Sequence, residues 1–141
     1  MIRTALIAAA LILAAAPALA QQAPAPHLKI TFETKSPTGS IMVALFDSEA
    51  AYGDGAPIAS AVVDVAAGKS EAEFEGLPAG RYAFKAFHDV NGNGRMDTNP
   101  FGLPVEPFAF SNNAVGNMGP ATWERASFDL TGDTTQTVRI R

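Results

Sequence analysis

The decapeptide HDVNGNGRMD, residues 88–97, carries acids and amides on alternate positions around two glycines. Oxygen-bearing side chains on every second residue converge where the backbone curls, and a calcium ion takes about six to eight oxygen ligands. We therefore expect a structural calcium loop, in which Gly94 supplies the sharp turn. Its expected ligands are the side chains of Asp89, Asn91, Asn93 and Asp97 and the carbonyl of Arg95.

The twelfth position of this loop departs from the EF-hand pattern. It is Pro100, which has no carboxylate, and Pro100 with Gly102 prevents the helix that completes an EF-hand. Further oxygens would come from water, a main-chain carbonyl or Glu106. The alternative is that the two Asn-Gly pairs are turn formers at the end of a strand, without an ion. The sequence leaves both interpretations open.

His88 beside Asp89 suggests acid–base chemistry, and with Glu106 it gives a second hypothesis, a small metal-dependent hydrolase. No Ser or Cys stands in a nucleophile context. A zinc site needs three or four nitrogen or sulfur ligands, which two histidines without cysteine do not provide. The catalytic constellation is incomplete, and we expect the protein not to be an enzyme.

The N-terminus, MIRTALIAAALILAAAPALA, has the features of a signal peptide. Arg3 precedes an apolar run that is too short to span a bilayer, and Ala18-Leu19-Ala20 supplies small residues for cleavage. We expect residues 1–20 to be removed after Ala20. The mature protein would then be periplasmic or secreted, without a transmembrane segment.

Charge and cysteine content exclude several classes of function. The net charge of the chain is −4, and loss of Arg3 with the signal peptide makes it −5 (−4 − 1). Nucleic acids and anionic lipids require a basic patch, so we expect neither as a partner. The chain has no cysteine, which excludes disulfides, thiol catalysis and thiolate metal sites.

Period-two hydrophobic patterns predict an all-β fold at residues 27–141, after a disordered leader at 21–26. The fold we expect is a single antiparallel β-sandwich, immunoglobulin-like or transthyretin-like, with about seven strands. The expected strands lie at 28–33, 40–47 (apolar on both faces and therefore central), 58–65, 71–74, 81–88, 123–130 and 135–140.

A long excursion at 89–120 interrupts the strands. Loops longer than about 12–15 residues in a compact domain are usually functional or disordered. This one contains apolar residues throughout, so we expect it to be ordered, packed on the sandwich and functional. Its candidates for ligand contact, with the residue just before it, are His88, Glu106, Ser111, Asn112 and Asn113.

The order of HDVNGNGRMD and GLPVEPFAFSNN resembles the bacterial "domain of unknown function 2141" family of exported proteins. Its typical steps are an HDxNxNGxxD loop, a GxPxE step and an FSNN step, and Pro107 after the Glu departs from the usual small residue. The resemblance covers about residues 28–140 and implies an exported, β-rich domain without a known activity. A shorter stretch, LPAGRYAFKAF, resembles transthyretin-like and carboxypeptidase regulatory-type sandwiches.

These observations favour a non-catalytic binding or accessory module of the bacterial cell envelope. The excursion would present Glu106 and residues 111–113 to a glycan, a peptide or another envelope protein. The alternatives are the hydrolase named above and a structural envelope component that self-associates through an exposed strand.

Overall fold

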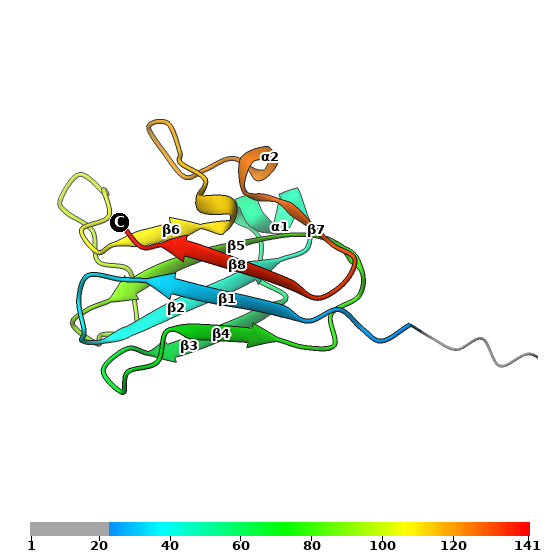
Figure 1. The fold of residues 1–141 in the computed structure, drawn as a ribbon. Coiled ribbons are helices and arrows are strands. Elements are labelled where there is room, and N and C mark those ends of the chain that lie inside the picture. The colour runs from blue at the N-terminus through cyan, green and yellow to red at the C-terminus, as the bar shows by residue number, and fades with distance from the viewer. Residues whose placement is uncertain (1–22) are drawn as a thin grey trace, which may run out of the picture.

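Two β-sheets packed face to face form the body of the protein, in a computed structural model that describes residues 23–141 (Figure 1). This confirms the predicted all-β class. The predicted signal peptide and the first two residues of the predicted leader lie outside the described residues. The rest of the leader, residues 23–26, has no regular secondary structure.

The first sheet has three strands in the order β4 (Glu71–Phe74), β1 (Leu28–Glu33) and β8 (Thr134–Arg139). β1 pairs antiparallel with β4 but parallel with β8, where Leu28 lies opposite Thr134. The parallel pair departs from the antiparallel arrangement that the sequence predicted. It arises because β8 enters this sheet from a strand of the other sheet and not through a hairpin.

The second sheet has the order β3 (Ala59–Asp64), β2 (Ser40–Phe46), β5 (Gly80–Asp89) and β6 (Phe108–Phe110). β7 (Phe128–Leu130) pairs with the first residues of β5, and β6 pairs with its later residues. β6 lies inside the predicted excursion, so the structure has eight strands where the sequence predicted seven.

The core lies between the two sheets and follows the period-two pattern. In β1, Leu28, Ile30 and Phe32 are buried, while the residues between them face outward. Phe84 of β5 is fully buried and meets Phe32 and Phe128 edge-on, with ring centroids 6.4 and 6.3 Å apart. Aromatic pairs prefer this arrangement, so these rings join both sheets and β7.

A second, smaller apolar cluster lies where the short helices α1 (Glu49–Asp54) and α2 (Trp123–Ala126) meet. Trp123 packs edge-on against Tyr52, at 5.8 Å between ring centroids. The prediction of one strand over 123–130 was therefore wrong in its first half. Trp123–Ala126 turn into a helix that covers α1, and the strand begins only at Phe128.

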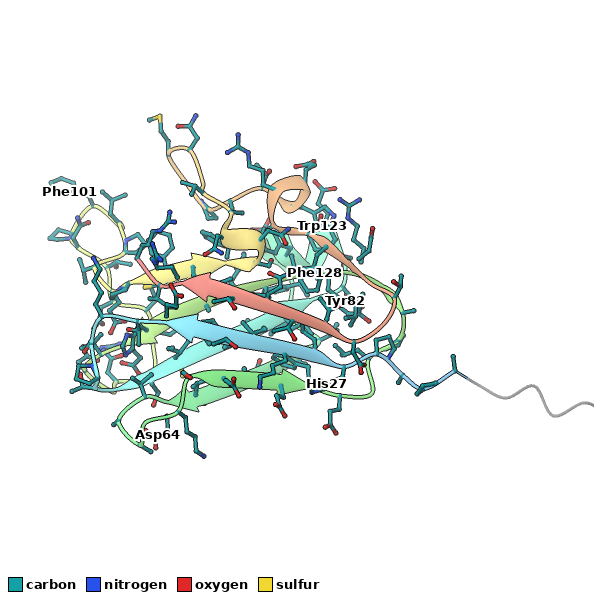
Figure 2. All side chains as sticks on the ribbon, in the orientation of Figure 1. His27, Asp64, Tyr82, Phe101, Trp123 and Phe128 are labelled. Carbon is teal, nitrogen blue, oxygen red and sulfur yellow. The ribbon has the colours of Figure 1, made fainter. Side chains whose placement is uncertain are left out.

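The excursion is ordered and leaves the sheet twice. Residues 90–107 form a loop closed by a bridge between Thr98 and Pro104, and residues 114–122 form a second loop after the 3-10 helix η1 (Ser111–Asn113). Both loops project from the sandwich in Figure 1. Figure 2 places Phe101 on the first loop, where its side chain is 88% exposed.

Across residues 23–141, none of the helices has the length and apolar character needed to cross a membrane.

Candidate functional site

The loop at 89–97 is organised by the buried carboxylate of Asp89. One oxygen accepts the backbone N–H groups of Gly92 (2.8 Å) and Asn93 (3.1 Å), and the other accepts that of Gly94 (2.7 Å). Gly92 and Gly94 have φ of 76° and 78°, a conformation that suits glycine. These three donors provide the hydrogen bonds that a buried carboxylate needs.

Asn91 and Asn93, two further predicted calcium ligands, gather at a third, Asp97. The side-chain amide of Asn93 donates to both of its carboxylate oxygens at 2.9 Å, and the amide of Asn91 donates to one of them. These bonds, helped by the charge of Arg95, hold the pKa of Asp97 below its usual value. The structure thus brings together Asn91, Asn93 and Asp97, three of the five predicted ligands.

Glu106 ties the two ends of this loop together. Its side chain is buried, one oxygen accepts the backbone N–H of Val90, and the other accepts that of Asp97, each at 3.1 Å. Glu106, which the sequence offered as a candidate for ligand contact, thus stabilises the loop from within the chain in this structure.

His88 is fully buried and has a partner at each ring nitrogen. Nε2 lies 2.6 Å from the carbonyl of Thr38, and Nδ1 lies 2.8 Å from the hydroxyl of Thr34. A carbonyl only accepts, so Nε2 carries the proton and Nδ1 accepts from Thr34. Since successive side chains of a strand point to opposite faces, His88 points inward and Asp89 points outward. The two residues do not form an acid–base pair.

Ser111 is fully buried at the end of β6. Its hydroxyl donates to the carbonyl of Ala126 at 2.6 Å and accepts the backbone N–H of Phe84 at 3.0 Å. It therefore connects the excursion with β5 and α2.

Asn112 and Asn113 attach the excursion to its neighbours. Both have positive φ (60° and 51°). The amide of Asn112 donates to three carbonyls at the end of α2, and Asn113 bonds the carbonyl of Thr137 and the N–H of Arg139, each at 2.8 Å. Asn113 thereby continues the hydrogen bonding at the edge of β8.

The outer face of the second sheet carries an apolar row that crosses four strands. Strand register places Val62 opposite Met42, Met42 opposite Phe87, and Phe87 opposite Phe108. None of the four is buried, and Val62 is 62% exposed. A sheet face that only contacts water normally carries polar residues, so this row is a candidate binding surface.

The two loops of the excursion turn this row into a groove of about 970 Å3, which we call the apolar groove. Leu103 and Met96 contribute from the first loop, and Met118 and Pro120 contribute from the second. Asp89 lies on the same face of β5 as Phe87, so the Asp89 loop sits at one end of the groove.

Sequence reasoning missed the apolar groove. The strand at 40–47 was predicted to be apolar on both faces and central; β2 does lie between β3 and β5, but its outward residue Met42 is only half-buried. The signal was present, because Val62 of β3 and Phe87 of β5 are also apolar on their outward positions. Three neighbouring strands with apolar outer positions, and no long helix to cover them, predict an open apolar face.

A separate cluster lies on the outer face of the first sheet. There His27, Glu73 and Glu75 bring potential ligand atoms within 4.8 Å of one another. Glu73 and Glu75 are exposed, and His27 Nε2 lies 3.8 Å from Glu73. Figure 2 labels His27 on this side of the sandwich, remote from the projecting loop that carries Phe101.

Residues 31–138 match a family model described as "Uncharacterized protein conserved in bacteria (DUF2141)". No curated protein and no solved structure matched the chain.

Proposed function

The chain belongs to this bacterial family of uncharacterized proteins, and we propose that it is an exported, non-catalytic binding module that holds an apolar ligand in the apolar groove. The single observation that carries the proposal is the partly exposed row of Val62, Met42, Phe87 and Phe108 between the two loops of the excursion. Export rests on the signal-peptide pattern of residues 1–20.

Size and chemistry of the apolar groove support a small-molecule ligand. Ligand sites are commonly about 300–1,000 Å3, mostly apolar and largely preformed, and the apolar groove is close to the upper end of that range at about 970 Å3. Burial of apolar surface contributes about 25 cal/mol per Å2, so a ligand that covers the row gains affinity without specific polar contacts.

The non-catalytic part of the proposal rests on the hydrogen bonds of the hydrolase candidates. His88 uses both ring nitrogens inside the fold, and both oxygens of Glu106 accept backbone N–H groups. These two groups support the loop and the strand end from within the chain, which is what a binding scaffold requires.

A fluorescent apolar probe, N-phenyl-1-naphthylamine, tests the binding proposal on residues 21–141. We expect a saturable rise in fluorescence that Val62→Asp abolishes, because a carboxylate on the groove floor loses hydration when the probe binds. Ile58→Asp is the matched control, since Ile58 is an exposed apolar residue outside the lining of the groove. Equal probe binding by the two variants would show that the probe binds elsewhere.

We also propose that the Asp89 loop binds Ca2+. The convergence of Asn91 and Asn93 on Asp97 supports this, because each carboxylate or amide oxygen has two lone pairs and can face an ion while accepting an N–H. Rotation of each amide by half a turn would direct its oxygen to the same point. The role of the ion is structural: it holds the loop that carries Met96 to the groove.

Thermal melts of residues 21–141 in EDTA and in Ca2+ up to about ten millimolar test the ion site. For a Kd near 10⁻⁴ M, ligand linkage adds about 2.7 kcal/mol to the unfolding free energy at a hundredfold excess. We expect a rise in midpoint with Ca2+ but not with Mg2+, and no rise in Asp97→Ala. Asp64→Ala is the control. An unchanged wild-type midpoint would make residues 89–97 a turn held only by hydrogen bonds.

A further inference from the structure

One cation stands in the apolar groove. Among the groove-lining side chains that the structure describes, Lys85 alone carries a charge, and Ser60 is the other polar one. Lys85 lies opposite Ala44 and Phe110, one outward row from Phe87. Rows on one face of a strand are about 7 Å apart, so the amine lies at the end of the groove nearest α1, away from the Asp89 loop.

The amine of Lys85 is positioned by α1. It donates one hydrogen bond to the carbonyl of Tyr52, and it lies 4.4 Å from the centre of the Tyr52 ring and 5.2 Å from that of Phe46. An ammonium group has three N–H donors, so two remain after the bond to Tyr52. The cation is therefore held in place but still able to bind an acceptor.

Lys85 forms no ion pair with the residues that the structure describes. In residues 23–141, the ion pairs join other residues, and none of the described carboxylates lies within 4.0 Å of this amine. Burial lowers the pKa of Lys85 from its ordinary value of 10.5, and the charge of Asp54 on α1 acts in the opposite direction. Lys85 also lines the adjoining hollow beyond the end of the groove, together with Glu49 of α1 and Glu124 of α2. A half-buried amine without a paired acid gains from an anionic acceptor that the ligand supplies.

From this charge pattern we propose that the ligand is a single-chain amphiphile with one carboxylate, a fatty acid. Its carboxylate accepts from Lys85, and its alkyl chain lies along Ala44, Met42 and Phe87 toward Leu103. One cation balances one negative charge, which a carboxylate carries at neutral pH and a phosphomonoester exceeds. This inference rests on the proposed binding function and specifies its ligand class.

The decisive experiment measures how well decanoate and 1-decanol displace N-phenyl-1-naphthylamine from the wild-type protein, and so compares their affinities. The two ligands differ only at the head group. A hydrogen bond to a charged partner corresponds to a preference of about tenfold to a hundredfold for decanoate. Between octanoate and decanoate, affinity should rise about fourfold per methylene, as expected for a buried chain.

Lys85→Met retains the apolar stem and removes the charge. We expect it to lose the preference for decanoate while its affinity for decanol stays within about twofold, and Lys85→Arg to keep the preference. Equal wild-type affinity for the two ligands would overturn the fatty-acid inference and leave the binding proposal in place. Binding of neither ligand would overturn both. The comparison in the wild-type protein needs no variant, so it holds even where Lys85→Met does not fold.

Size-exclusion chromatography at the protein concentration of the binding assay tests whether a second copy of the chain occupies the groove instead. A monomer leaves the groove free for the fatty acid, as we expect. A dimer that Val62→Asp converts to a monomer, while Ile58→Asp does not, would show that a second copy of the chain covers the groove, and would overturn the inference.

Discussion

Glu106 accepts the backbone N–H of Asp97 at 3.1 Å through one carboxylate oxygen, and that of Val90 through the other. One carboxylate therefore joins the two ends of the eight-residue stretch from Val90 to Asp97. Together with Asp89 at the start of the loop, it makes two buried acids that hold the segment by accepting backbone donors.

Replacement of Glu106 by Gln should destabilise this loop. A buried amide presents an NH2 group to a backbone N–H donor, and an unsatisfied buried donor costs about 1–3 kcal/mol. Urea unfolding measures the loss, and the amide NMR signals of Val90 and Asp97 should shift with it. Glu124→Gln, at an exposed position, is the control. Unchanged amide signals for Val90 and Asp97 in Glu106→Gln would contradict the assigned contacts.

Ser111→Ala should lower the unfolding free energy by about 1–3 kcal/mol, because it leaves the buried N–H of Phe84 and carbonyl of Ala126 without this hydroxyl. Ser60→Ala, at an exposed position, should change it by less than about 0.5 kcal/mol. Differential scanning calorimetry compares the two. Equal losses in the two variants would argue against a structural role for the Ser111 hydroxyl.

Gly39→Ala should be the most disruptive of these changes. Gly39 has φ of 71°, and a Cβ atom there would lie 2.0 Å from the carbonyl oxygen of Asp89. The strand end that starts the loop would have to move. Gly132→Ala is the matched control, since nothing lies within 4 Å of an added Cβ and its φ is not positive. We expect a large fall in thermal midpoint for Gly39→Ala and a small change for Gly132→Ala, and similar midpoints would contradict the close approach.

Alkaline pH should weaken the contact between α1 and α2. Burial raises the pKa of Tyr52 from 10.0 to about 12, and its hydroxyl donates to the carbonyl of Ala121 at 2.8 Å. The folded state therefore retains this proton to a higher pH than the unfolded state does. The stability contribution is therefore complete below pH 10 and is lost as pH rises toward 12.

Urea unfolding between pH 8 and pH 12.5, with absorbance titration of the phenols, measures this loss. Tyr52→Phe should show a flatter dependence of stability on pH between about 10 and 12 than the wild type. An identical pH dependence in the two proteins would assign the alkaline change to Tyr82, whose pKa is also raised by burial and by Asp47.

The sequence predicted the strands best where one face of the strand is buried and the other is exposed to solvent. Leu28, Ile30 and Phe32 alternate with polar residues, and β4 has the predicted bounds Glu71–Phe74. It failed at Trp123, where aromatic and apolar residues suit both a strand and a short helix. The contact of Trp123 with Tyr52 favours the helix, and because Tyr52 is distant in sequence, the local hydrophobic pattern could not predict it.

The same limit applies to the candidate site. Alternation around Gly94 predicted that Asn91, Asn93 and Asp97 would gather, because that follows from local geometry. The internal roles of Ser111 and Asn113 depend on α2 and β8, which meet the excursion only in the folded chain. The calcium and hydrolase hypotheses both concern the excursion, and the residues that it contacts elsewhere in the fold cannot be predicted from local sequence.

The parallel pair of β1 and β8 has a consequence for how the protein matures. Leu28 lies beside Thr134, so β1 has to pair with a strand that is synthesised much later. Contacts between distant parts of a chain slow folding, because loop closure precedes the gain in packing. A nascent chain that lacks β8 leaves one edge of β1 without its neighbour, so the first sheet is complete only once β8 has been synthesised.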